Sequence, residues 1–175
     1  MLTIVDITIV HMIDESPDTS FIGEYTDELS DWVISRFHEE YVANVDDDEY
    51  IAERGTSYRF FKPYAGGEPE GSLEYQKYGM QDYKRMEALS RGDWCFIGIK
   101  AEAIVSRDIG HGSNRLQRFE SGGLWGIESD SGDCYLKPMA HEQLEDLKEH
   151  LEAFGVDTSD FDDFVEEAVD NPINR

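Results

Sequence analysis

Basic residues are missing from two long segments of this 175-residue chain, one at its start and one that stops just before the final residue, Arg175. Residues 1–35 contain eight acidic residues and no Lys or Arg, and residues 149–174 contain nine acidic residues and again no Lys or Arg. The whole chain has 39 Asp and Glu against 15 Lys and Arg, a formal net charge of −24. Because such self-repulsion disfavours a compact state, the acidity needs a reason, such as solubility at high salt or a basic partner. It excludes direct binding to nucleic acid.

Long apolar runs, a secretory signal and clustered cysteines are also lacking. The longest apolar stretches, Leu2–Ile13 and Trp94–Val105, are interrupted by charged residues and are shorter than the roughly 20 residues of a membrane span. The N-terminus has neither the basic start nor the small-residue cleavage pattern of a signal peptide, so we expect a soluble protein in the cytoplasm of a bacterial host. Cys95 and Cys134 are widely separated, which predicts free thiols rather than a disulfide or a zinc site.

The pattern of apolar residues predicts one α+β domain over residues 1–175. A composition with 39% hydrophobic residues is rich enough for a single core. Strands are expected at 2–13 in the centre of a sheet, 57–63 at an edge, 93–103, 115–121 and 124–129, and helices near 27–40, 73–91, 139–154 and 159–170. Since strands and helices do not alternate regularly, we expect an antiparallel sheet of about four to five strands, ending in a meander, with three to four helices packed mainly on one face.

Two C-terminal helices are predicted to carry acidic residues opposite an apolar stripe. Their polar faces do not mix the two charge signs, although Glu and Lys at i, i+4 would gain a few tenths of a kcal/mol. Acidic residues near the C-terminal end of the final helix are disfavoured further by the helix dipole. Local helix stability therefore does not explain these residues.

Rows of carboxylates on a helix repeat about every 6 Å, which is comparable to the spacing of phosphates along a nucleic-acid strand. Such rows can imitate a nucleic-acid backbone and bind the Lys and Arg that would otherwise neutralise phosphates. The sequence therefore predicts an acidic partner-binding surface built from three segments. Its members are Asp46, Asp47, Asp48, Glu49, Glu142, Glu145, Asp146, Glu149, Glu152, Asp160, Asp163, Glu166, Glu167 and Asp170.

Other interpretations stay open beside this one. The acids can form an ordinary solvated face. A haloadapted or phage-encoded housekeeping domain is another alternative, and haloadaptation fits the content of six Lys against nine Arg. Haloadaptation predicts acids spread evenly over the surface and stability that rises with molar salt. An enzyme predicts a concave pocket with convergent polar groups around Ser121–Asp133.

The segment Ser121–Asp133 has the most distinctive local sequence, SGGLWGIESDSGD. It lacks the G-x-S-x-G elbow of hydrolases and the Lys and Ser/Thr of a phosphate-binding loop, and a tight hairpin explains Gly122–Gly123 as well. Glu128, Asp130 and Asp133 offer oxygen ligands, but the calcium-loop pattern is absent. We therefore expect no enzyme, no catalytic residue, no metal and no cofactor.

Five short strings are spread over most of the chain. They are DESPD at 14–18, GEY at 23–25, QDYKRME at 81–87, RGDW at 91–94 and SGGLWGIES at 121–129. With them the chain resembles a family of small proteins encoded by bacteriophages and other mobile elements, to which no reaction is assigned. The resemblance implies a mobile-element context and a counter-defence role. In function the chain is similar to acidic antirestriction and anti-CRISPR proteins, which imitate DNA, and no functional residue carries over from them.

The resulting hypothesis is a non-enzymatic inhibitor that occupies the nucleic-acid groove of a host defence nuclease or CRISPR effector. Its partner would be a basic nucleic-acid-binding protein, such as a CRISPR effector or a restriction enzyme. Neither nucleic acid nor a membrane is expected to bind the chain directly, and the oligomeric state is left open.

Overall fold

The computed structural model describes residues 2–36, 39–42, 59–110 and 113–175. Contacts divide the chain into two compact units, which differs from the single domain expected over residues 1–175. The terminal unit comprises Met1–Pro17 and Cys95–Arg175, and the inserted unit comprises Asp18–Trp94. They separate because the inserted segment has its own sheet, helix and apolar cluster. The fold class is α+β, as predicted.

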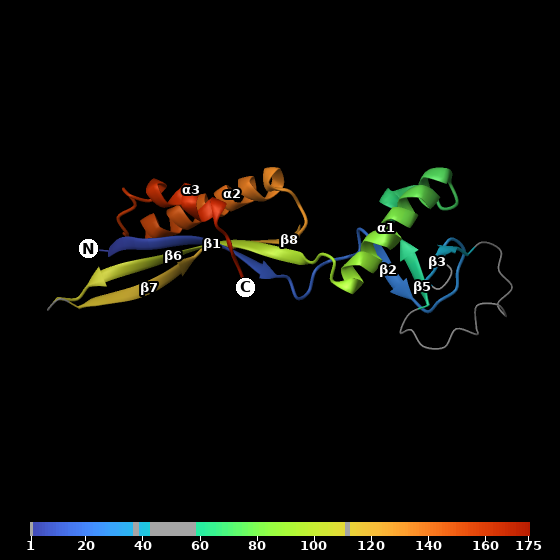
Figure 1. Ribbon diagram of the computed structural model, residues 1–175, viewed down its shortest axis with the longest axis horizontal. Coiled ribbons are helices and arrows are strands. Elements are labelled where there is room, and N and C mark those ends of the chain that lie inside the picture. Colours follow the sequence, from blue (N-terminus) through green and yellow to red (C-terminus); the bar gives the residue numbers. More distant parts are fainter. Residues whose placement is uncertain (1, 37–38, 43–58, 111–112) are drawn as a thin grey trace. The chain divides into compact units, whose positions relative to one another are not determined.

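A five-stranded sheet forms the base of the terminal unit (Figure 1). Its strands are β1 (Leu2–Ile13), β6 (Phe96–Asp108), β7 (Asn114–Glu120), β8 (Leu124–Glu128) and β9 (Ile173–Asn174). The order is β7-β6-β1-β9, with β8 also paired to β6, and only the β1–β9 pair is parallel. Strand β1 has the predicted bounds and lies at the predicted interior position, between β6 and β9. Its β-branched residues favour a strand that is covered on one face.

The expected meander of the last three strands is wrong. Strand β7 pairs with residues 102–108 of β6, and β8 pairs with residues 96–99 of the same strand. The two short strands therefore follow one another along one edge of β6 instead of pairing with each other. This arrangement is possible because β6 has 13 residues, enough to accommodate both partners.

Helices α2 (Asp133–Ala153) and α3 (Asp162–Asp170) cover the same face of this sheet (Figure 1). The predicted stripe of Leu144, Leu147 and Leu151 is buried there against Ile7, Ile9 and β6. Phe154 follows the end of α2 and is 68% exposed, so it lies outside this buried stripe. Its ring instead packs edge-on against Phe119, with centroids 5.4 Å apart.

Both helices begin at residues other than those expected. Helix α2 starts before Pro138, because the amides of Tyr135 and Leu136 already donate to the Gly132 carbonyl at 2.8 and 3.1 Å. Helix α3 starts after the expected residue 159, since the Ser159 amide donates to the Asp157 carboxylate and Ser159 does not cap the helix.

The inserted unit contains a four-stranded antiparallel sheet of order β2-β5-β3-β4. Its elements are β2 (Gly23–Thr26), β3 (Ile34–Ser35), β4 (Glu40–Tyr41), β5 (Phe60–Pro63), the 3-10 turn η1 (Ala65–Gly67) and helix α1 (Leu73–Arg91). The helix expected near 27–40 is absent from the described residues of that range, so this prediction is wrong. Val33 and Ile34, which are adjacent in the sequence, are both buried beside β5. Strand β5 is interior and not at an edge, since β2 and β3 flank it.

Helix α1 has the predicted bounds. The Ser72 hydroxyl caps its first turn by accepting from the Tyr75 amide at 3.0 Å, and Gly92 ends it with a left-handed φ of 77°. Gly79, within this helix, has a packing role, because a Cβ there would overlap the Tyr41 hydroxyl and the Pro63 ring.

Candidate interaction surface

The outward faces of α2 and α3 are strongly acidic. Residues 133–170 contain 13 acids and two lysines, whereas the remaining residues of the terminal unit contain eight acids and five bases. Both helices bury apolar stripes against one face of the sheet, so their polar residues face solvent. Nine of the ten predicted residues here are exposed, and Asp146 is half-buried.

Three of these ten side chains have partners within the fold. Asp146 accepts from the Gly122 amide at 2.7 Å and lies 3.6 Å from His150. Asp170 accepts from Lys137 at 2.6 Å, and Glu152 accepts from the Thr158 hydroxyl at 3.1 Å.

Seven predicted side chains make no ion pair within the described part of the chain. We call this set the acidic helix face. Its members are Glu142, Glu145 and Glu149 on α2, Asp163, Glu166 and Glu167 on α3, and Asp160, which lies in the turn before α3 and not on the helix predicted for it. Glu142, Glu145 and Glu149 follow one another at intervals of three and four residues, which aligns them along one side of α2. The fourfold acidic block Asp46, Asp47, Asp48 and Glu49 lies outside the described residues.

The two lysines of α2 both pair with α3. Lys148 donates to Asp162 at 2.9 Å, and Lys137 donates to Asp170 at 2.6 Å, which raises the pKa of Lys137. These pairs were not predicted, because the polar face of α3 was considered by itself, without the cations that α2 supplies. No pattern in the sequence of α2 identifies the partners of Lys137 and Lys148.

Three further cations, Lys100, Arg118 and Arg175, pair with carboxylates on the sheet face that α2 and α3 leave open. Glu102 alternates with the core residues Ala101 and Ala103, so it points away from the helices. Its carboxylate, 8% exposed, accepts from Arg175 at 2.8 and 3.1 Å and lies 3.7 Å from Arg118. Lys100 donates to Glu120 at 2.8 Å, and this bond lowers the pKa of Glu120.

The segment Ser121–Asp133 connects β7, β8 and α2, and its first residues are bonded to the scaffold. The Ser121 hydroxyl accepts from the Ala101 amide at 3.0 Å and donates to Gln143 at 2.9 Å. The Gly122 and Gly123 amides donate to Asp146 and Gln143. These amides are thus already occupied, and they offer no free pair of donors for a developing oxyanion. The tight hairpin expected at Gly122–Gly123 is wrong, since β7 and β8 do not pair with each other.

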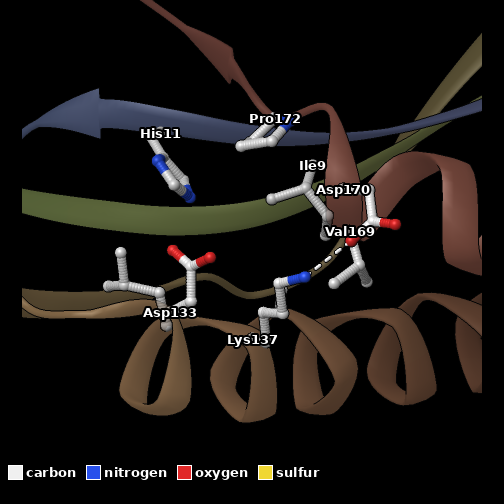
Figure 2. Close-up of a pocket in the computed structure, with 9 residues that line it drawn as sticks. Ile9, His11, Asp133, Lys137, Val169, Asp170 and Pro172 are labelled. Atoms are coloured by element: carbon white, nitrogen blue, oxygen red, sulfur yellow. Dashed lines mark hydrogen bonds and ion pairs between the residues drawn. The ribbon is translucent and has the colours of Figure 1, made fainter.

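A small cavity of about 110 Å³, with both polar and apolar lining residues, lies between β1, α2 and the end of α3 (Figure 2). Figure 2 shows His11 and Asp133 at one end and the Lys137–Asp170 ion pair at the other. Burial lowers the pKa of His11, which favours its neutral form. The described residues contain no group of three or more His, Cys, Asp or Glu placed to hold a metal ion.

Comparison of the chain with protein-family models, with curated proteins and with solved structures finds no match. The resemblance to bacteriophage and mobile-element proteins therefore stays a prediction. No helix in the described ranges has the length and apolar character needed to cross a bilayer. Cys95 and Cys134 are both free thiols, as predicted.

Proposed function

We propose that the protein is an inhibitor that imitates nucleic acid and occupies the nucleic-acid groove of a host defence nuclease or CRISPR effector. The observation that supports this function most directly is the acidic helix face, where seven exposed carboxylates make no ion pair within the described part of the chain. A basic groove would pair its Lys and Arg with these carboxylates in place of phosphates. The inhibitor works by occupation and carries out no reaction, and it acts in the cytoplasm of a bacterial host.

The sorting of charge favours this proposal over haloadaptation. Acids that serve only for solubility in brine would be spread evenly, but those of the terminal unit are concentrated in its helices. The bonding of Ser121, Gly122 and Gly123 into the scaffold likewise weakens the case for an enzyme centred on that segment.

The test is a cleavage assay on a panel of purified restriction nucleases and CRISPR effectors. Wild-type protein should inhibit at least one member, and inhibition should weaken steeply as salt is raised. Reversal of Glu142, Glu145 and Glu149 to Lys should abolish this inhibition, because these exposed residues lie in one row of α2.

A matched variant controls for the change in net charge. Reversal of the exposed Glu24, Glu68 and Glu74 to Lys changes the charge by the same amount but acts on the inserted unit. This control should keep inhibition. Equal losses in both triple variants, or inhibition that is insensitive to salt, would contradict the proposal.

A further inference from the structure

Two cations of the terminal unit make no ion pair in the described part of the chain. They are Arg107 on β6 and Arg115 on β7, both of them exposed, and we call them the arginine pair. The other five cations of this unit each pair with a carboxylate; they are Lys100, Arg118, Lys137, Lys148 and Arg175. The arginine pair therefore differs from its neighbours in having charges that the described fold does not use.

The arginine pair is placed where it disfavours the fold. Its two members lie directly opposite each other in the antiparallel pairing of β6 and β7. Side chains at such positions have Cβ atoms about 4.5–5.5 Å apart, and like charges there are destabilising. Asp108 follows Arg107, and Asp157 bridges to the start of β1, but each carboxylate accepts from the amide two residues further on, at 2.7 and 3.1 Å. In a chain with 39 acids, the described residues supply no counter-charge to this pair.

The arginine pair lies on the same side of the sheet as the acidic helix face. Arg107 follows the core residues Ala103 and Val105 at intervals of two, so it points to the side that α2 and α3 cover. Figure 1 shows that β6 and β7 extend beyond the helix layer at this end, which leaves the pair uncovered. Helix α2 ends nearby, because Phe154 packs on Phe119 of β7. One partner surface can therefore contact both features.

We infer that the groove of the partner holds a cluster of carboxylates beside its Lys and Arg, and that the arginine pair binds this cluster. The inference rests on the proposed function and narrows the partner to a metal-dependent nuclease. Such nucleases hold Mg²⁺ through carboxylates at the place where the reacting phosphate binds. A guanidinium can bind a carboxylate through two parallel hydrogen bonds, so the arginine pair would occupy the position of the metal ion.

Phosphates of a nucleic acid already held by the partner are the competing ligand for the arginine pair. The observations favour carboxylates, because an acidic helix face that replaces nucleic acid in the groove leaves no phosphates there. Carboxylates belong to the nuclease itself, whereas phosphates are present only when nucleic acid is bound. Binding measured without nucleic acid therefore distinguishes the two ligands.

The experiment is a calorimetric titration of the full chain into a nuclease that it inhibits in the cleavage panel, with no nucleic acid present. At an ionic strength kept equal with KCl, about 10 mM Mg²⁺ should weaken binding of the wild-type chain by about tenfold relative to EDTA, because the metal ion competes for the carboxylates. The double variant Arg107→Gln, Arg115→Gln should bind about tenfold more weakly in EDTA and respond to Mg²⁺ by less than about twofold.

A matched variant removes two positive charges elsewhere. Lys62 and Lys84 are exposed residues of the inserted unit, and their double replacement by Gln should leave both the affinity and the Mg²⁺ response within about twofold of wild type. Urea unfolding gives a readout that needs no nuclease. The Arg107→Gln, Arg115→Gln variant should unfold at the same or a higher urea concentration than wild type, because a repulsion is removed.

Each of three results overturns the inference while the proposed function stands. They are wild-type binding that does not respond to Mg²⁺, equal losses in the two double variants, and tighter binding to nuclease that carries nucleic acid, which would assign the arginine pair to phosphates. A lower unfolding midpoint of the arginine variant also overturns it, since the pair would then serve the fold. If the chain inhibits no member of the panel, the proposed function fails and this inference fails with it.

Discussion

The hydrogen bonds of Ser121 and Gln143 hold the chain in place between β7 and β8. They are 4% and 6% exposed, and buried polar groups of this kind need partners inside the protein. The Ser121 hydroxyl meets this need by accepting from Ala101 and donating to Gln143, which also accepts from the Gly123 amide. The first three residues of the most distinctive string, 121–123, are therefore explained by their bonds to β6 and α2.

Ser121→Ala should destabilise the protein by about 1–3 kcal/mol, because it leaves the buried Ala101 amide without an acceptor. Urea unfolding measures this loss. Ser131→Ala is the matched control, since the Ser131 hydroxyl has no hydrogen-bond partner in the residues described, and it should change stability little. An equal effect of both substitutions would contradict the structural role given to Ser121.

Gly79 illustrates a limit of residue-level reasoning. Helix propensity marks a glycine in a helix as unfavourable by about 1 kcal/mol relative to alanine. In the folded inserted unit this glycine instead permits the close approach of Tyr41 and Pro63 to α1. The benefit becomes visible only when the strands that approach the helix are known.

Helix α3 combines a buried apolar anchor with exposed charges. Phe161, directly before it, is 2% exposed and belongs to the core, whereas the Asp162 side chain is 83% exposed although it pairs with Lys148. An ion pair in this exposed setting contributes little to stability. Burial of apolar side chains therefore holds α3 on the sheet.

Two neighbouring substitutions test this assignment. Phe161→Ala should cost about 3–5 kcal/mol, as other buried Phe residues do. Asp162→Asn, which removes the ion pair but keeps the size of the side chain, should cost at most about 1 kcal/mol. Urea unfolding of both variants under the same conditions gives the comparison, and a larger loss for Asp162→Asn would show that charges hold the helix.

The net charge of −24 acts on the molecule as a whole. The terminal unit carries 21 acids and seven bases, and the inserted unit carries 18 acids and eight bases, so each unit repels itself. Salt screens such repulsion most between exposed charges, and screening is nearly complete at about 1 M, where the Debye length is about 3 Å. Stability should thus rise with salt up to about 1 M and then level off, whereas haloadaptation predicts a rise that continues at molar salt.

Replacement of Glu142, Glu145 and Glu149 by Gln should raise the free energy of unfolding by about 0.5–1 kcal/mol at low salt, because like charges at helical spacing are removed. This gain should vanish at about 1 M salt. Glu102→Gln is the control, since it weakens the buried pairing with Arg175 and should destabilise at every salt concentration. A gain that persisted at high salt would exclude repulsion as its cause.

The bounds of β1 and α1, the α+β class and the acidic outer faces of the last two helices were predictable from the sequence. These features depend on local periodicity, capping residues and the order of charges, which act between residues close in the chain. Only the tertiary structure decided that the chain forms two units, that β7 and β8 share one edge of β6, and that Lys137 and Lys148 pair with α3. Those outcomes depend on contacts between residues far apart in the sequence. A periodic pattern predicts which face of a helix or strand is buried, but it does not identify the element that packs against that face.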